Sequence, residues 1–187
     1  IVFSQTMKLS KPYRNFFDYL HENKARYMVV GGLALQYYCG EYRKFPVQYC
    51  CGEYRKILDL DVWVDVQEEN LLRVLDALAK MGFVDHKYGP ELLSADPAVR
   101  FVIRNPDLYR MPDKIIDIFS EQSGSDFNRA YAYRSIAQFD SRKVSLIPLD
   151  ELIIIKQVCT RDKDKQDLEV LLKQRNKQNH SSMDASS

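Results

Sequence analysis

Residues 54–66 constrain the fold more than any other part of the chain, because they combine a strand pattern with two carboxylates. Apolar and polar positions alternate there: Leu58, Leu60, Val62, Val64 and Val66 are interleaved with Asp59, Asp61, Trp63 and Asp65. This period of two predicts a β-strand with one buried face and places Asp59 and Asp61 on the same side. Two such carboxylates can converge on a divalent cation, whereas without a cation they repel each other. The alternative is a solvent-facing strand side on which acidic residues are tolerated.

A second candidate segment lies upstream, where a short apolar run meets two glycines. Residues 27–30 form a predicted strand, and Gly31 and Gly32 lead from it into a helical pattern. Glycines at the start of a helix allow backbone N–H groups to approach a phosphate closely.

A third segment lies downstream, in the apolar run 114–119. Asp117 stands there between isoleucines, where an unpaired carboxylate would be costly. We therefore expect Asp117 to lie beside Asp59 and Asp61 on adjacent strands.

These segments, in this order, resemble the nucleotidyltransferase superfamily that includes DNA polymerase β. More narrowly, they are similar to the small bacterial minimal and abortive-infection-type nucleotidyltransferases. Residues 149–156 and 161–168 resemble the C-terminal helices of that group, so that the resemblance spans roughly residues 25–172. It implies an α+β fold in which a small mixed β-sheet is flanked by helices and followed by C-terminal helices.

The resemblance also implies a chemistry: transfer of a nucleotidyl group from a nucleoside triphosphate to an acceptor, with two Mg²⁺ (or Mn²⁺) ions. Asp59 and Asp61 would bind both ions, and Asp117 would complete one site and act as a candidate general base. The nucleotide-binding residues implied are Gly31, Gly32, Arg55 and Lys156.

Two other functions remain open. One is a non-catalytic nucleotide-binding or toxin–antitoxin partner subunit of the same fold, and the other is an interaction domain whose acids are merely solvated. Ile57 favours the non-catalytic interpretation, since the resembling family usually has Thr or Ser there. The acceptor could be tRNA, protein or a small molecule such as an antibiotic, because a fold does not fix it. A homo-oligomer or an antitoxin-type partner is possible.

A tandem duplication separates the glycine pair from the acidic strand. Residues 36–44 recur as residues 48–56 with one difference, Tyr38 against Cys50. We expect residues 40–51 to be a protruding insertion, because Pro46 disfavours one unbroken helix through both copies. Only the second copy places an arginine, Arg55, where the resembling family has one before its Asp-x-Asp strand.

Lys156 lies in a helical run that is apolar nearly all round, and its role has two interpretations. It could extend its charge to water, or it could contact an anionic ligand. For Asp164 and Asp167, at helical spacing further on, salt bridges with Arg161 and Lys163 are the simpler expectation.

The composition is that of an ordinary globular protein, with 45% hydrophobic and 28% charged residues and a net charge of +1. The near-zero charge gives no basic footprint typical of a dedicated nucleic-acid binder. We expect one cytoplasmic domain over residues 7–174, a frayed polar tail over 175–187, no membrane span and four reduced cysteines. We expect helices over 13–23, 68–81 and 127–134, and three further helices that begin near 33, begin near 150 and contain Asp164. We expect strands over 27–30, the acidic run, 99–104, 114–119 and 143–147.

Overall fold

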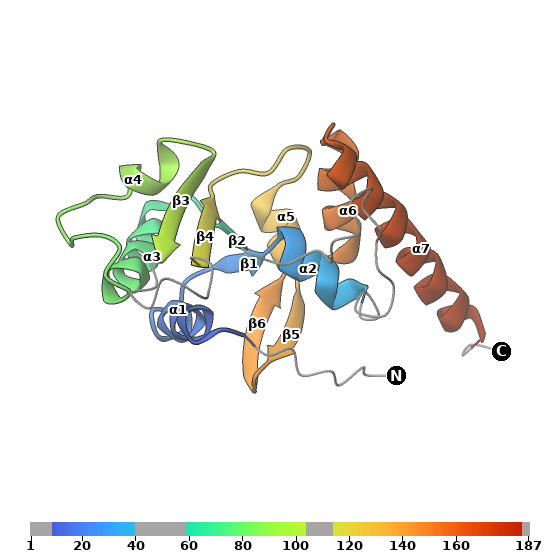
Figure 1. Ribbon diagram of the computed structural model, residues 1–187, viewed down its shortest axis with the longest axis horizontal. Coiled ribbons are helices and arrows are strands. Elements are labelled where there is room, and N and C mark those ends of the chain that lie inside the picture. The colour runs from blue at the N-terminus through green and yellow to red at the C-terminus, as the bar shows by residue number, and fades with distance from the viewer. Residues whose placement is uncertain (1–8, 40–58, 104–113, 185–187) are drawn as a thin grey trace, which may run out of the picture.

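The fold is α+β, with a six-stranded mixed sheet flanked by helices (Figure 1). The computed structural model describes residues 9–39, 59–103 and 114–184. The described helices are α1 Lys11–Glu22, α2 Gly31–Tyr38, α3 Glu68–Lys80, α4 Glu91–Ser94, α5 Phe127–Ala132, α6 Leu149–Val158 and α7 Asp162–Asp184. The strands are β1 Tyr27–Val29, β2 Asp59–Val64, β3 Ala98–Ile103, β4 Lys114–Phe119, β5 Ser135–Phe139 and β6 Arg142–Leu146.

The strands lie in the order β3-β4-β2-β1-β6-β5. Two neighbouring pairs are parallel, β2 with β4 and β1 with β6, and the other pairs are antiparallel. The acidic strand β2 is therefore central. Its parallel neighbour β4 carries the lone aspartate of the sequence pattern, with Asp61 opposite Asp117 in the register.

The period-two pattern of β2 buries Leu60, Val62 and Val64 fully, as expected. Val66, expected on the same face, lies beyond the end of β2 and is exposed. The other face changes character along the strand. Asp59 and Asp61 are partly exposed at its start, whereas Trp63 is buried and packs edge-on against Phe127 of α5. Helix packing thus covers one end of this face and leaves the acidic end accessible.

Helix α1 begins with Pro12 in its first turn, where a missing N–H costs nothing, and buries one face. The buried residues recur at helical spacing: Tyr13, Phe16, Phe17 and Leu20. This face contributes to the core, and α1 also contacts α3.

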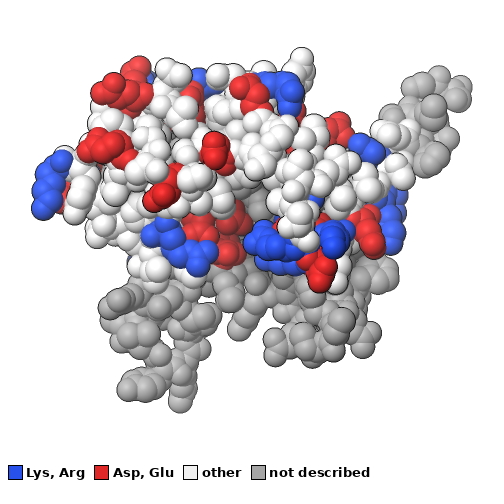
Figure 2. All heavy atoms as spheres, turned by 90° about the horizontal axis from the view of Figure 1, so that it is seen from above, with Lys and Arg blue, Asp and Glu red and all other residues white. Residues whose placement is uncertain are grey.

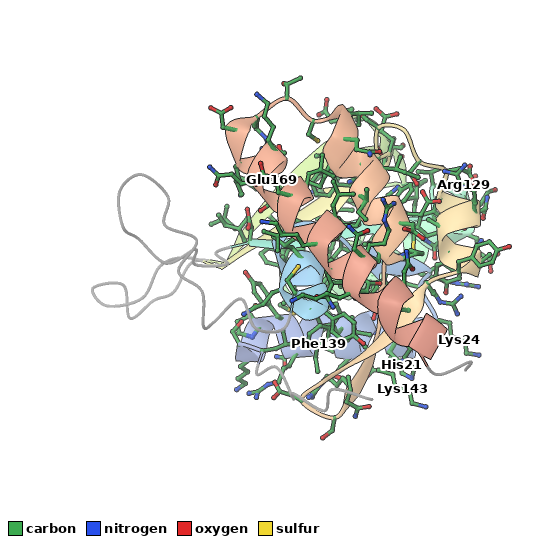
Figure 3. All side chains as sticks on the ribbon, turned by 90° about the vertical axis from the view of Figure 1, so that its right-hand side faces the viewer. His21, Lys24, Arg129, Phe139, Lys143 and Glu169 are labelled. Atoms are coloured by element: carbon green, nitrogen blue, oxygen red, sulfur yellow. The ribbon has the colours of Figure 1, made fainter. Side chains whose placement is uncertain are left out.

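Helices α6 and α7 form a pair at one end of the molecule, to the right in Figure 1. Seen from that side, α7 runs across α2, which it contacts (Figure 3). The tail expected to be frayed over 175–187 is helical as far as Asp184, where α7 and the described residues end.

The β5–β6 hairpin goes beyond the sequence prediction, which covers only a strand at 143–147. Its two-residue loop, Asp140 and Ser141, has positive φ at both positions (45° and 69°), the conformation of a tight hairpin turn. Asp140 is held there by the backbone N–H of Leu9, which donates to its Oδ2 at 2.7 Å.

The duplicated segment 40–51 and the expected arginine at position 55 lie outside the described residues. Within the described part of the chain, no helix combines the length and apolar character needed to cross a membrane.

Candidate metal and nucleotide site

Three carboxylates from two adjacent parallel strands meet at one point. One oxygen each of Asp59, Asp61 and Asp117 lies within 4.8 Å of the others. The strand pairing explains this, because β2 and β4 run in the same direction with Asp61 opposite Asp117, and Asp59 lies two residues away on the same face. The convergence expected from the alternation pattern is therefore found.

The glycine pair lies directly against this cluster. The backbone N–H of Val30 donates to the carbonyl oxygen of Asp61 at 3.0 Å, which joins the end of β1 to β2. Helix α2 then begins at Gly31, and the N–H of Gly32 donates to the Asp61 carboxylate, Oδ2, at 3.4 Å. The turn thus places helix-terminal backbone donors beside the carboxylates.

Gly31 is required by its position. Its φ is +59°, a conformation that other residues rarely adopt, and a Cβ built there would lie 1.9 Å from Oδ2 of Asp61. No side chain fits between this backbone and the carboxylate.

Crowding perturbs the acidity of the cluster. Burial raises the pKa of Asp61 from 3.8 to about 6, and the charges of Asp59 and Asp117 act in the same direction. The N–H of Gly32 and the charge of Lys163 oppose this rise. The cluster therefore carries unfavourable negative charge that a cation would relieve.

Arg100, which sequence reasoning missed, supplies a cation from β3. It lies opposite Asp117 in the antiparallel β3–β4 register. Its guanidinium donates to both oxygens of that carboxylate, from Nε to Oδ1 at 2.8 Å and from Nη2 to Oδ2 at 2.7 Å. The only signal in the sequence was a basic residue inside a strand pattern, which by itself does not reveal its partner.

Tyr13 of α1 is a second residue beside the cluster that the sequence did not single out. Its hydroxyl donates to the carbonyl oxygen of Ile115 on β4 at 3.0 Å. Burial raises the pKa of Tyr13 to about 12, and the negative charges of the three aspartates act in the same direction. The phenol therefore stays protonated at neutral pH and fixes α1 to the strand that carries Asp117.

Lys156 does not extend to water, so that expectation is wrong. It is 7% exposed, and its ammonium donates to Asp167 at 2.9 Å and to Asp164 at a shorter distance. Arg161 also donates to Asp164, at 2.6 Å, as expected from the sequence. Lys156 therefore has its charge committed to two fully buried carboxylates rather than available to an anionic ligand.

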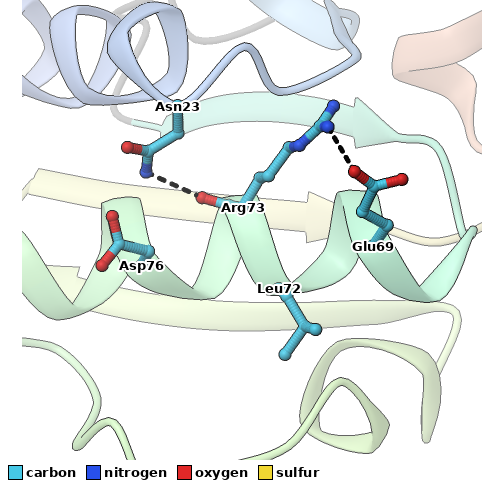
Figure 4. Close-up of a pocket in the computed structure, with 5 residues that line it drawn as sticks. All are labelled: Asn23, Glu69, Leu72, Arg73 and Asp76. Atoms are coloured by element: carbon cyan, nitrogen blue, oxygen red, sulfur yellow. Dashed lines mark hydrogen bonds and ion pairs between the residues drawn. The ribbon is translucent and has the colours of Figure 1, made fainter.

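A separate surface depression lies along α3 (Figure 4). It is lined by Asn23, Glu69, Leu72, Arg73 and Asp76. Arg73 forms an ion pair with Glu69 at 2.6 Å, and its carbonyl oxygen accepts from Asn23 at 3.0 Å. None of the three clustered aspartates lines this depression.

The face shown in Figure 2 has acidic atoms lying between two groups of lysine and arginine atoms. Opposite charges therefore lie side by side on this face.

The donor set fits a hard divalent cation. Mg²⁺ and Mn²⁺ prefer carboxylate oxygens and water, and they are commonly held by one or two carboxylates together with substrate phosphates. Asp59, Asp61 and Asp117 supply such oxygens within reach of one another, beside helix-terminal N–H groups that suit phosphate.

No protein-family model matches the chain, and the search of curated proteins found no match. Among solved structures, the chain is similar to the lincomycin-bound crystal structure of the lincosamide antibiotic adenylyltransferase LnuA. The identity is 15% and the TM-score 0.49, and the alignment covers 89% of this chain and 98% of that one.

Proposed function

We propose that this chain is a metal-dependent nucleotidyltransferase that transfers a nucleotidyl group from a nucleoside triphosphate to an acceptor. The observation that carries the proposal is the convergence of Asp59, Asp61 and Asp117 beside the Gly31–Gly32 turn. The crowded carboxylates of Asp59 and Asp61 favour an added cation, and a glycine turn at a helix start suits a phosphate. Their juxtaposition suits a metal-bound polyphosphate better than either ligand alone.

Each group has a definite role in this proposal. Asp59 and Asp61 would hold two Mg²⁺ (or Mn²⁺) ions, and Asp117 would complete one of the two sites. Bound metal ions would neutralise the charge that develops on the entering and leaving oxygens during attack on the α-phosphate. Asp117 accepts the proton of the acceptor hydroxyl, and Gly31 and Gly32 let the backbone approach the β- and γ-phosphates.

A specific observation favours the alternative, a nucleotide-binding subunit without turnover. Both carboxylate oxygens of Asp117 accept hydrogen bonds from Arg100. A carboxylate engaged in this way is a poor base and a poor metal ligand. If the pair persisted with nucleotide bound, the site would bind the triphosphate through Asp59 and Asp61 and would not react.

The two functions are distinguished by turnover. The chain would be incubated with each of the four α-phosphate-labelled ribonucleoside triphosphates, with Mg²⁺ or Mn²⁺, and with tRNA, protein and small-molecule acceptors including antibiotics. The proposal expects label on one acceptor class, lost on addition of EDTA and in an Asp61→Asn variant. Metal-dependent nucleotide binding with no labelled product would favour the non-catalytic subunit, and no binding at all would reject both.

A further inference from the structure

The acidic cluster already contains a cation that belongs to the protein. The guanidinium of Arg100 forms two parallel hydrogen bonds to Asp117, at 2.8 and 2.7 Å. Among the three clustered aspartates, Asp117 alone is hydrogen-bonded to Arg100. Its side chain is also nearly buried, at 8% exposed, so this pair is the main compensation for its charge.

We propose that Arg100 competes with a divalent metal ion for Asp117, so that metal binding at the full cluster requires the guanidinium to leave. This inference rests on the proposed function, because it assumes that the cluster binds a metal. It assigns Arg100 as a positioning residue that determines when Asp117 joins Asp59 and Asp61.

The competition follows from the geometry of the carboxylate. The planar guanidinium takes both oxygens of Asp117 in a bidentate arrangement. An ion bound between Asp117 and the other two acids would also face the positive charge of Arg100 across the same carboxylate. The two cations therefore oppose each other, both for the oxygens and through direct repulsion.

Arg100 is free to leave without disturbing the core. Its side chain is 59% exposed, and β3, which carries it, is an edge strand of the sheet. Asp117, in contrast, is fixed on an inner strand between buried isoleucines. The guanidinium is thus the partner that moves, and a rotation of its side chain into water releases the carboxylate.

An order of events follows. Asp59 and Asp61 remain accessible in the arrangement described, so a first ion binds to them while Arg100 still holds Asp117. Asp117 contributes only after the guanidinium is displaced. The pair therefore weakens metal affinity and stabilises the metal-free protein at the same time.

The test is a calorimetric titration of the full chain with Mn²⁺ after dialysis against EDTA and removal of the chelator. We expect Arg100→Gln to bind Mn²⁺ at least about tenfold more tightly than the unaltered chain. Arg100→Lys keeps the charge but loses the bidentate geometry, and should lie between the two. If Arg100→Gln folds poorly, the Mn²⁺ affinity of Arg100→Lys alone tests the competition.

Arg142→Gln is a matched control, because Arg142 forms a similar two-bond pair with Asp18, at 2.6 and 2.8 Å. Strand β6 is parallel to β1, with Val29 opposite Leu146, so Arg142 lies at the other end of the sheet from the aspartates. Its removal changes the net charge equally and should leave Mn²⁺ affinity unchanged.

The outcomes separate this inference from the function on which it rests. Tighter binding in Arg100→Gln, with Arg142→Gln unchanged, supports the competition. Mn²⁺ binding that is equal or weaker in both Arg100 variants would overturn it and leave the metal site intact. An equal gain of Mn²⁺ affinity in Arg142→Gln would also overturn it, because the gain would then come from the lower net charge and not from the release of Asp117. If neither the unaltered chain nor any variant binds Mn²⁺, the inference and the proposed function both fail.

Discussion

The backbone of Gly31 and the carboxylate of Asp61 are packed so closely that a methyl group on residue 31 would lie 1.9 Å from Oδ2. The start of α2 and the acidic strand are therefore fitted to each other at this point. The position of Asp61 depends on the absence of a side chain at residue 31.

Gly31→Ala should be destabilising for two reasons: the positive φ disfavours an L-residue, and the new methyl group displaces Asp61. We expect a loss of about 2–4 kcal/mol in the free energy of unfolding, measured by urea denaturation. Gly82→Ala is the matched control, because Gly82 has a φ of +79° and a methyl group added there would meet no other atom within 4 Å. Its loss should be only about 1–2 kcal/mol. Equal losses at the two positions would contradict the contact with Asp61.

The raised pKa of Asp61 predicts a pH dependence of stability in metal-free protein. Its folded-state pKa, about 6, exceeds the ordinary 3.8. Between about pH 4 and 6, the Asp61 carboxyl is therefore protonated to a greater extent in the folded state than in the unfolded state. The contribution of this group to stability is therefore greatest at low pH and declines as the pH rises through that window.

Asp61→Asn removes the charge and should raise the free energy of unfolding at pH 7 by about 1–3 kcal/mol, with little gain at pH 4. Unfolding curves in the presence of EDTA at several pH values measure the difference. A gain that is the same at pH 4 and pH 7 would show that the charge of Asp61 is not its source.

The ion cluster of Lys156 predicts a large loss of stability when the lysine is removed. Asp164 and Asp167 are fully buried, and Lys156→Ala would leave both without its ammonium. We expect a loss of about 3 kcal/mol, the low end for breaking a buried ion pair, because Arg161 still compensates the charge of Asp164. Lys165→Ala, which removes an exposed partner of Asp162, should change stability by no more than about 0.5 kcal/mol. A small effect of Lys156→Ala in urea denaturation would mean that water reaches the two carboxylates.

Local patterns in the sequence predicted that Asp59, Asp61 and Asp117 converge, whereas their proposed roles came from the family resemblance. Alternation placed Asp59 and Asp61 on one face, the glycine pair marked the turn, and the isolated Asp117 pointed to a neighbouring strand. Each of these inferences depends on residues that are close in sequence, where periodicity and backbone preferences act directly.

The partners of Asp117 and Lys156 could not be predicted in the same way. The pairing of Arg100 with Asp117 depends on the β3–β4 register, which brings together two residues that are 17 positions apart in the sequence. The partners of Lys156 depend on how α7 packs against α6. The β5–β6 turn lacks glycine, so its only local signal was Asp140, a residue type that tolerates positive φ. Contacts of Asp140 with Leu9 and Arg14 support the turn.

Binding of a metal-associated nucleotide at the three aspartates can be measured by calorimetric titration with each nucleoside triphosphate. The titrations compare the unaltered chain and the Asp59→Asn, Asp61→Asn double variant, each with Mg²⁺ and with EDTA. We expect at least one triphosphate to bind the unaltered chain with Mg²⁺, and none to bind with EDTA or to the folded double variant. Equal binding under all conditions, or none under any, would contradict it.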